Sequence, residues 1–429
     1  MEEARMLFRF FLDFFLAWWW LFLPFLLWRP VKFLWIWWRQ EIFDTQQRSM
    51  FLEVKFSEGI PRPFKAMEDV FSALWQTHDP ANPREKWLEG KYQLSFAFEI
   101  VSTEGNVHFY IRLPAGAQKL VESAIYAQFP QVELQVAEDY TKFVPRDIPN
   151  KDWDVWGTNY VLEKPDPVPI RTYSEFFEDS PSEKEEFRVD PMALLVEGLS
   201  RLGKGEHIWV QFVLKPVLHG ESGLPEAGLE LVNTIVKRPV APKPRSLLDD
   251  VKSVGGHVAT GAEPVAAAAA KEEFIPPEMK LTPGQRDLVA AIERKVSKYA
   301  FSVMSRFVYV ARRENYFGPA KALPMSWYTQ FSGATYNNLR PLKHTLTKVY
   351  TVFTWFLDRR RTFVKKRRIF RNYVMRVPPN FPQPGGTFYL NIEELATIFH
   401  FPGKMTTPSA SVSRVGAKKG EAPPGLPVE

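Results

Sequence analysis

Residue types that commonly carry catalysis or bind metals are sparse in this chain and poorly spaced. The sequence has no cysteine and seven histidines, and no two histidines are three or four positions apart, as a metal-binding pair on one helix face would be. Residues 198–204 have the glycines and lysine of a phosphate-binding loop, but Gly205 follows where Ser or Thr would hold magnesium. No nucleophile elbow, zinc-protease motif or carboxylate pair stands out. We therefore expect no enzyme, no cofactor and no metal site.

A strongly basic stretch at residues 359–376 has aromatic residues between its charges. It holds nine Lys or Arg and no acidic residue. Basic side chains neutralise phosphates, aromatic rings stack on bases, and the same charges attract anionic lipid. The stretch therefore predicts a nucleic-acid site, an anionic-lipid site, or an ordinary charged face that meets an acidic partner. The residues that we expect to bind nucleic acid or lipid are Arg359, Arg360, Arg361, Lys365, Lys366, Arg367, Arg368 and Arg371.

The first forty residues hold an aromatic and apolar block that water solvates poorly. Residues 14–28 carry no charge, which gives roughly 22 Å of helix against a hydrocarbon core of about 30 Å, so one interpretation is a single thin span kinked at Pro24. From Pro30 onward, apolar residues at helical spacing predict a second helix in the membrane interface. The alternative is a buried helical hairpin. The predicted anchor residues are Phe14, Trp18, Trp19, Trp20, Phe22, Phe25, Trp28, Trp35 and Trp38.

The residues that flank this block indicate its orientation. Net positive charge is greater after the block than before it, which by the positive-inside rule favours a cell-membrane protein with its body on the cytoplasmic side. A cleaved signal peptide does not fit, because bulky Trp and Arg occupy the positions where a cleavage site needs small residues. The absence of cysteine suits a reducing compartment.

The rest of the chain alternates strand-like and helix-like stretches in an order typical of ferredoxin-like domains. Over residues 49–141 the periodicity predicts a strand, a helix, a hairpin turning at Gly105-Asn106, a helix and a strand. A linker is expected at 142–189. A second unit is expected at 190–400, begun by the helix start Asp190-Pro191 and interrupted by a flexible insertion at about 217–281. The predicted fold class is therefore α+β, with two tandem ferredoxin-like units behind an N-terminal membrane helix at 1–48.

The later part of the second unit shows further start signals. Thr282 opens a capping box with proline at the first helical position, so we expect an ordered helix to begin there, after the flexible insertion. Residues 368–376 and 388–390 are predicted strands, and 393–399 a short helix. Residues 401–429 are rich in Pro, Gly, Ser and Lys and are expected to form a disordered tail.

Three stretches together resemble a bacterial protein family. They are residues 51–68 (FLEVKF…PFKAME), residues 98–130 (FEIVSTEG…FYI…LVESAIYAQFP) and residues 393–402 (EELATIFHFP) followed by APP…LP. In their residues and in their order along the chain they are similar to the membrane-anchored, non-ATPase portion of proteins related to conjugative type IV secretion ATPases and the HerA/FtsK superfamily. The resemblance covers most of residues 51–427, except the insertion and parts of 342–384.

The resemblance implies a membrane-proximal scaffold that works with a separate ATPase. In ATPase-bearing relatives, the stretch like 394–427 leads into the nucleotide-binding domain, whereas this sequence stops at Glu429 and has no Walker motif, so no catalytic residue is carried over. The partner-docking residues that the resemblance implies are Glu394, Leu395, His400, Phe401 and Pro402.

These observations predict a membrane-anchored, non-enzymatic scaffold or accessory subunit of a type IV secretion-like, conjugative DNA-translocation apparatus. Its partners would be the membrane, a P-loop ATPase on a separate chain, further copies of itself joined at free sheet edges, and DNA or anionic lipid. The alternative function is a membrane-tethered nucleic-acid-binding protein that uses residues 359–376. A third hypothesis is a split ATPase whose catalytic half lies on another chain.

Overall fold

One antiparallel sheet of nine strands forms the centre of the protein. The computed structural model describes residues 13–14, 17–18, 21, 23–56, 63–176, 190–236, 281–351, 354–380 and 383–403. The strands are β1 (Ser49–Phe56), β2 (Phe96–Thr103), β3 (Asn106–Pro114), β4 (Val132–Ala137), β5 (Trp153–Leu162), β6 (Glu206–Val217), β7 (Ala300–Arg312), β8 (Leu339–Pro341) and β9 (Thr387–Asn391). The central strands β6 and β7 are buried along almost their whole length, because both faces of the sheet are covered there.

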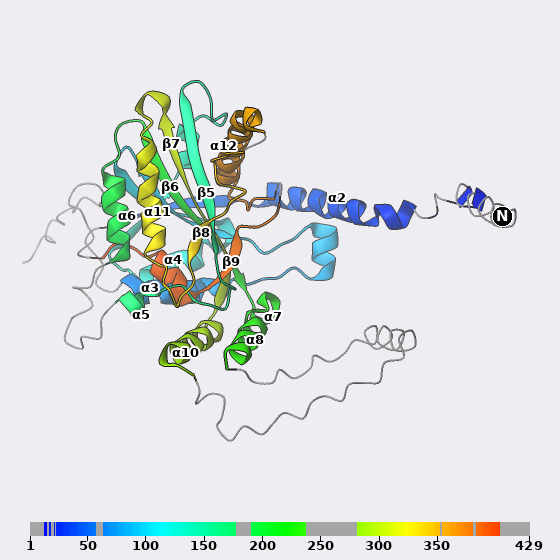
Figure 1. Ribbon diagram of the computed structural model, residues 1–429, viewed down its shortest axis with the longest axis horizontal. Coiled ribbons are helices and arrows are strands. Elements are labelled where there is room, and N and C mark those ends of the chain that lie inside the picture. The colour runs from blue at the N-terminus through cyan, green and yellow to red at the C-terminus, as the bar shows by residue number, and fades with distance from the viewer. Residues whose placement is uncertain are drawn as a thin grey trace, which may run out of the picture.

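The strand order divides the sheet into two halves that meet at β2 and β6. The order is β4-β1-β3-β2-β6-β7-β5-β8, and β9 pairs with the first part of β7. β2 and β6 pair from Phe96 opposite Leu214 to Thr103 opposite His207. The strands of residues 49–141 and those of residues 153–391 are therefore parts of a single continuous sheet (Figure 1).

The two faces of the sheet are covered by different helices (Figure 1). The helices that contribute to the large core on the first face are α3 (Pro63–Trp75), α4 (Gln118–Gln128), α6 (Pro191–Ser200), α11 (Ala322–Thr329) and α13 (Ile392–Ile398). On the opposite face, α12 (Asp358–Met375) packs through Ile369, Phe370 and Tyr373. A separate small cluster joins α8 (Leu224–Val236) to α10 (Pro283–Ser297) through Val232, Val236 and Ile292, beside α7 (His219–Ser222).

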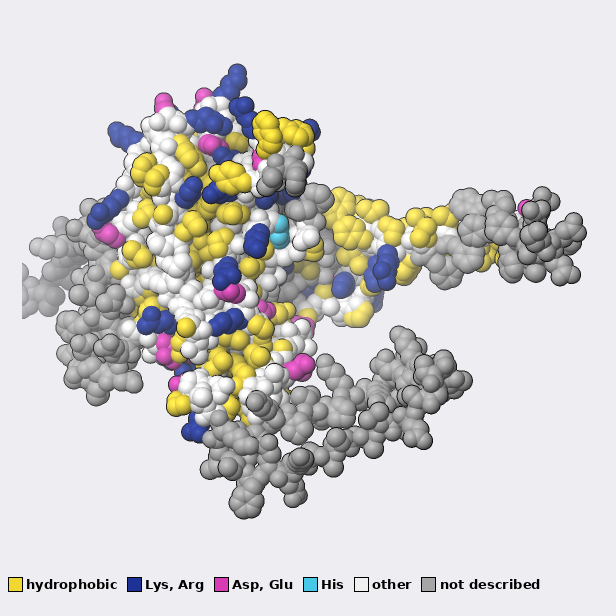
Figure 2. Space-filling model, viewed as in Figure 1, with side chains coloured by type: hydrophobic (Ala, Val, Ile, Leu, Met, Phe, Trp, Pro, Cys, Tyr) yellow, Lys and Arg dark blue, Asp and Glu magenta, His cyan; other side chains and the backbone are white. Residues whose placement is uncertain are grey.

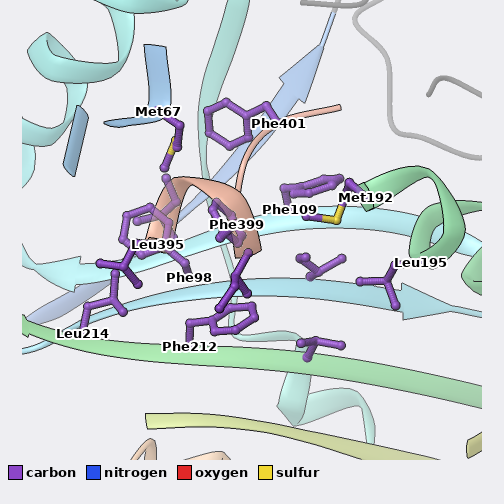
Figure 3. Packing of buried hydrophobic residues seen from close by; sticks show 14 of the residues in the cluster. Met67, Phe98, Phe109, Met192, Leu195, Phe212, Leu214, Leu395, Phe399 and Phe401 are labelled. Carbon is purple, nitrogen blue, oxygen red and sulfur yellow. The ribbon is translucent and has the colours of Figure 1, made fainter. Parts of the chain in front are cut away.

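The core of the first face is a stack of aromatic and aliphatic side chains between strands and helices (Figure 3). Phe399 packs edge-on against Phe98 of β2, with ring centroids 5.0 Å apart, and Phe401 packs against Phe109 of β3 at 6.3 Å. Met67 of α3 and Leu195 of α6 fill the space beside them. The residues after α13 are therefore part of the core.

Several local signals in the sequence set the element boundaries as expected. The side chain of Asp190 accepts a hydrogen bond from the backbone N–H of Met192 and caps α6. Thr282 and Gln285 form the predicted capping box at the start of α10. The β2–β3 hairpin turns at Glu104 and Gly105, both with positive φ, and a Cβ at Gly105 would lie 2.8 Å from a backbone oxygen of Ser200.

Three boundaries differ from those predicted. Residues 142–189, expected as a linker, contain the ten-residue strand β5, because its mixed apolar and polar residues are buried by neighbours far away in sequence. Residues 219–236, expected within a flexible insertion, form α7 and α8, because α8 buries its apolar side against α10. Residues 368–375 belong to α12 rather than to a strand, and Arg376 follows its end, since Ile369, Phe370 and Tyr373 fall on one helical side. Residues 237–280 and 404–429 lie outside the described residues.

The N-terminal helix also differs from the prediction. α2 (Leu23–Gln46) is one helix that runs through Pro30, instead of a span followed by a separate interfacial helix. The remaining short elements are α5 (Tyr173–Phe176), η2 (Glu85–Glu89), η3 (Ala115–Ala117), η4 (Tyr140–Phe143), η7 (Arg313–Asn315), η8 (Gly318–Lys321) and η9 (Trp355–Leu357). In the part of the chain that the structure describes, no helix combines the length and the apolar character needed to cross a membrane.

Candidate functional site

Helix α2 presents a broad apolar surface to the solvent. Nine of its large apolar side chains are more than two fifths exposed: Leu26, Leu27, Trp28, Val31, Phe33, Leu34, Trp35, Trp37 and Trp38. At 3.6 residues per turn they span well over half of the helix circumference. The helix projects from the body, and hydrophobic side chains cover much of it in the space-filling view (Figures 1 and 2). An uncovered apolar surface of this kind marks a site for a membrane or an apolar partner.

The loop that carries η2 fastens α2 to the body. Trp87 stacks on Trp28 with ring centroids 6.4 Å apart, and its carbonyl accepts a hydrogen bond from Trp35 Nε1 at 2.8 Å. Gly90 lies so close to α2 that a Cβ there would be 2.2 Å from the carbonyl carbon of Arg39. Gly90 also has a φ of 72°, which disfavours any side chain. These contacts fix the direction in which α2 leaves the body.

The predicted anchor residues are only partly within the described chain. Phe14 and Trp18 are exposed and lie in short helical stretches before α2, while Trp28, Trp35 and Trp38 are exposed on α2 itself. The backbone of Phe25 is part of α2, and its side chain lies outside the description. Trp19, Trp20 and Phe22 lie outside the described residues.

The basic stretch forms the outward side of α12. Arg360, Arg367 and Arg371 are exposed and share one helical side with Val364 and Met375, which are 42% and 58% exposed. Before the helix begins, the large side chains of Tyr350, Trp355 and Phe356 are also exposed. Apolar and cationic side chains therefore lie together at this end of the molecule, where Figure 2 shows both kinds over α12.

The eight predicted basic residues do not act as one group. Arg359 is exposed, and Arg361 donates to Thr354 Oγ1 at 2.6 Å and pairs with Asp358 at 3.6 Å. The half-buried Lys366 binds both carboxylate oxygens of Asp154 at 2.8 Å. Half-buried Lys365 donates to the carbonyls of Lys343 and Leu346, and Arg368 is half-buried. Of the eight, only Arg359, Arg360, Arg367 and Arg371 are exposed and form no ion pair with a described residue.

A row of polar side chains crosses the sheet beneath α12. Cross-strand partners in register form the row Gln135, Glu53, Tyr110, Glu99, Gln211, Arg306 and Asn159, one from each of seven adjacent strands. Gln211 donates to Glu99 Oε1 at 2.6 Å and accepts from Arg306 Nε at 2.7 Å. Because the residues are far apart in the sequence, no local sequence pattern predicts this row. Only the pairing of the strands brings them together.

Arg376, just after α12, fastens the helix to this polar row. Its guanidinium donates to Glu99 Oε1 at 2.9 Å and to Asp139 Oδ2 at 2.9 Å. Burial acts to lower the pKa of Arg376, but the combined effects of Glu99, Tyr140 and Asp139 outweigh it and the pKa is raised. Burial lowers the pKa of Arg306 to about 9, which leaves it charged at neutral pH. Tyr373 of α12 completes the contact through its hydroxyl, 2.7 Å from that of Tyr140.

The predicted docking residues are not on the surface. Glu394 is fully buried and pairs with the equally buried Lys295 at 3.1 Å, and burial raises the pKa of Glu394 although Lys295 opposes the shift. His400 is buried and its Nε2 lies 2.7 Å from Asp190 Oδ1. The other three predicted docking residues, Leu395, Phe401 and Pro402, are buried as well. The prediction that these side chains form a docking surface is wrong, because the polar ones bind partners inside the core.

No protein-family model matches this chain, and no curated protein matches its sequence. The described residues include no group of three or more side chains that could hold a metal ion.

Sequence reasoning missed a polar groove between α2, the sheet and the end of α12. Its lining includes Asp44 of α2, Arg112 of β3, Lys215 of β6 and Ser302 of β7. The groove has a volume of about 380 Å³ and continues into a second hollow of about 280 Å³, which Arg48 also lines. Arg112 and Lys215 are a hundred positions apart in the sequence, so only the strand order brings them to one place.

Proposed function

We propose that the protein is a membrane-bound, non-enzymatic scaffold whose helix α2 lies with its apolar side chains in the bilayer interface. The exposure of nine large apolar side chains on α2 carries this proposal. Transfer of such side chains out of water contributes roughly 1.5–3 kcal/mol each, so several of them suffice for stable attachment. Arg29, Lys32 and Arg39 on the same helix suit the headgroup region. The localisation that we propose is the cell membrane, with the body on the cytoplasmic side.

The start of α12, together with the segment just before it, is the proposed second contact with the membrane surface. Its exposed aromatic residues resemble those that gather at the headgroup level of bilayers, and exposed Arg359 and Arg360 follow directly. Cations near an anionic leaflet contribute about 1 kcal/mol each. Attachment would therefore combine apolar insertion by α2 with charge attraction by α12.

The two halves of the sheet are, in this proposal, tandem ferredoxin-like units joined at their second strands. Each half runs strand-helix-strand-strand-helix-strand along the chain, if the helical segment between β6 and β7 is set aside. The orders β4-β1-β3-β2 and β6-β7-β5-β8 are mirror sequences of one another when each half is numbered separately. The pairing of β2 with β6 hides one edge of each unit, which leaves β4 and β8 at the ends of the sheet as sites for further copies or partners.

The role in a secretion-like apparatus with a separate P-loop ATPase rests on the sequence resemblance alone. Because residues 393–402 are buried, an ATPase would meet other surfaces, such as the edge strand β4. Affinity purification of the tagged full chain from detergent-solubilised native membranes tests this role. Recovery of a P-loop ATPase in near-equal amount supports it, and recovery of the chain without any ATPase rejects it.

Vesicle flotation tests membrane binding directly. The full chain, exchanged from detergent onto phosphatidylcholine vesicles with and without phosphatidylglycerol, is expected to float with both kinds. Binding should be tighter when phosphatidylglycerol is present, because of the cations on α12. If the full chain stays at the bottom of the gradient with both kinds of vesicle, the proposal is rejected.

Nucleic-acid binding by α12 is the second candidate function. It is favoured by exposed Phe363, which lies between Arg359, Arg360 and Arg367 and could stack on a base. Affinity for a single-stranded oligonucleotide would then fall steeply with salt, and should be lost when the three arginines become Gln. Binding that is absent, or that does not change with salt, rejects this function.

A further inference from the structure

The groove between α2, the sheet and α12 has a cationic lining that the rest of the described protein does not neutralise. Val213 and Met304 line it and form a small apolar cluster with Ala97, on the same face of the sheet as α12, and this cluster is called the floor of the groove. Arg112 is the cross-strand partner of Ala97, and Lys215 is that of Ser302. The strand register thus places Arg112 and Lys215 on either side of the floor.

Neither cation has an acidic partner among the described residues. No described residue forms an ion pair or hydrogen bond with the side chain of Arg112. Lys215 lies over the ring of Tyr92, with Nζ 5.5 Å from the ring centroid, and forms no ion pair. The carboxylate in the lining, that of Asp44, accepts a hydrogen bond from the Tyr92 hydroxyl. Arg376 also lines the groove, but Glu99 and Asp139 already neutralise it.

The partial burial of these two cations is unfavourable without an anion. Burial lowers the pKa of Arg112, and the nearby charge of Arg376 lowers it further, against smaller opposing effects of Glu99, Asp139 and Asp44. Burial also lowers the pKa of Lys215, against a smaller opposing effect of Asp44. A positive charge that is held away from water without a counter-charge favours the binding of an anion there.

We propose that this groove binds a phosphate-type oxyanion, with Arg112 and Lys215 as the ligands that neutralise it. A guanidinium can contact two oxygens of one phosphate side by side, and the ammonium of Lys215 supplies a second charge. Hydroxyl donors are present in the lining at Ser95 and Ser302, and amide donors at Gln40 and Asn380. Arg48 lines the adjoining hollow and would attract the anion to the entrance.

The oxyanion has two sources, a phospholipid headgroup or a free phosphate. The groove lies at the end of α2 that is joined to the body, next to the apolar helix that we place in the membrane interface. A headgroup is therefore within reach when α2 is in the bilayer. The binding chemistry itself does not require a membrane, so this inference stands apart from the proposed function.

Binding is tested with the full chain in detergent micelles and two probes. The first is radiolabelled inorganic phosphate in equilibrium dialysis, and the second is phosphatidylglycerol added to the micelles and followed by protection of Lys215 from acylation, measured by mass spectrometry. The proposal expects binding of at least one probe. If phosphate binds, its affinity should fall at least tenfold in the variant Arg112→Gln, Lys215→Met, and if phosphatidylglycerol binds, the lipid concentration that protects Lys215 should rise at least tenfold in the variant Arg112→Gln, which keeps Lys215. Binding of phosphate alone assigns a free ligand, and protection by phosphatidylglycerol alone assigns a headgroup.

A matched control and a separate readout keep the result independent of folding and membrane attachment. The control variant Arg201→Gln, Lys119→Gln also removes one arginine and one lysine, from exposed positions outside the groove, and should bind as the unchanged chain does. The protection measurement on the unchanged chain needs no variant. The proposal is overturned if neither probe binds, or if the groove variant binds as tightly as the control. Vesicle flotation of the groove variant, which keeps α2, separates this failure from a failure of the membrane proposal.

Discussion

Helices α2 and α12 both present apolar and cationic side chains to solvent, but the body holds them in opposite ways. α2 is joined to the body by Trp87, which contacts Trp28 and Trp35, and by Gly90, which lies against Arg39, and nine of its large apolar side chains stay exposed. α12 buries Ile369, Phe370 and Tyr373 on the sheet and leaves its cations outside. The exposed apolar area of α2 indicates that this helix binds a surface outside the protein. α12, in contrast, packs on the sheet and presents a charged side to solvent.

The largest expected effect concerns the apolar side of α2. Replacing Leu26, Trp28, Val31 and Leu34 with Gln should weaken vesicle binding by at least ~100-fold, because each buried side chain contributes roughly 1.5–3 kcal/mol. Flotation over a range of lipid concentrations measures the change. The control variant carries the same substitution at exposed apolar positions of the body, Val136, Leu194, Leu229 and Phe317, and should float as before. If both variants bind vesicles equally, the exposed apolar side chains of α2 are no more important for binding than those of the body.

The second effect concerns the attachment of α12. Arg376→Met leaves the buried Glu99 without its charge partner and should lower the free energy of unfolding by about 3–5 kcal/mol. Urea unfolding, followed by tryptophan fluorescence, measures it. Arg371→Met, on the exposed side of the same helix, should change the unfolding free energy by no more than about 0.5 kcal/mol. Similar losses in both variants would mean that α12 is not held through the polar row.

The third effect concerns the attachment of α2. Gly90→Ala introduces a Cβ that meets the backbone of Arg39 and a residue that disfavours positive φ, so local stability should fall by about 1–3 kcal/mol. Hydrogen–deuterium exchange over residues 39–46 should become faster. Gly220→Ala, where no atom lies within 4 Å of the added Cβ, serves as the control and should leave the exchange unchanged. Unchanged exchange in Gly90→Ala would show that other contacts fix α2.

The fourth effect is smaller and depends on salt. Arg359→Gln together with Arg360→Gln should reduce binding to phosphatidylglycerol vesicles by about tenfold at low salt, because each cation contributes roughly 1 kcal/mol at most. Raising the salt concentration should remove the difference from the unchanged chain. Binding to pure phosphatidylcholine should stay the same, and a loss there would contradict the division of roles between the two helices.

The smallest effect concerns the groove. Lys215→Met should stabilise the protein by roughly 0.5 kcal/mol at pH 7 without added anion, because the charged form is partly desolvated. The pKa of Lys215 is lower in the folded protein than the unfolded value of about 10.4, so the penalty is present at neutral pH and is relieved as pH rises toward that value. Thermal unfolding at pH 7 and pH 10 should show the advantage of the variant shrinking. A variant less stable at pH 7 would indicate that Lys215 has a stabilising partner.

Boundaries set by local chemistry could be predicted, and contacts between distant segments could not. Asp190 with Pro191, Thr282 with Gln285, and the turn at Gly105 act within a few residues, and each is found where the sequence places it. The joining of two half-sheets through β2 and β6 depends on pairing across about a hundred residues, which no local pattern encodes.

Charged residues in the core were the main source of error for the candidate sites. Glu394 and His400 were predicted to dock a partner because of the family resemblance alone, whereas charged side chains can be buried when they are paired. Lys295 and Asp190, distant in sequence, bind them inside the protein. Arg112 and Lys215 could not be predicted as neighbours either, because their shared groove exists only after the strands have paired.

The short connection between α2 and the sheet has a mechanical consequence. Gln47 and Arg48 alone separate the end of α2 from β1, and β1 is paired with β3 on one side and with β4 on the other. Any pull on α2 passes within two residues into a strand held along both edges. The component of the load along β1 is resisted by many hydrogen bonds in shear, which break together rather than one after another. Under such a pull, the body would therefore move with α2 as one folded unit instead of unfolding from its N-terminal side.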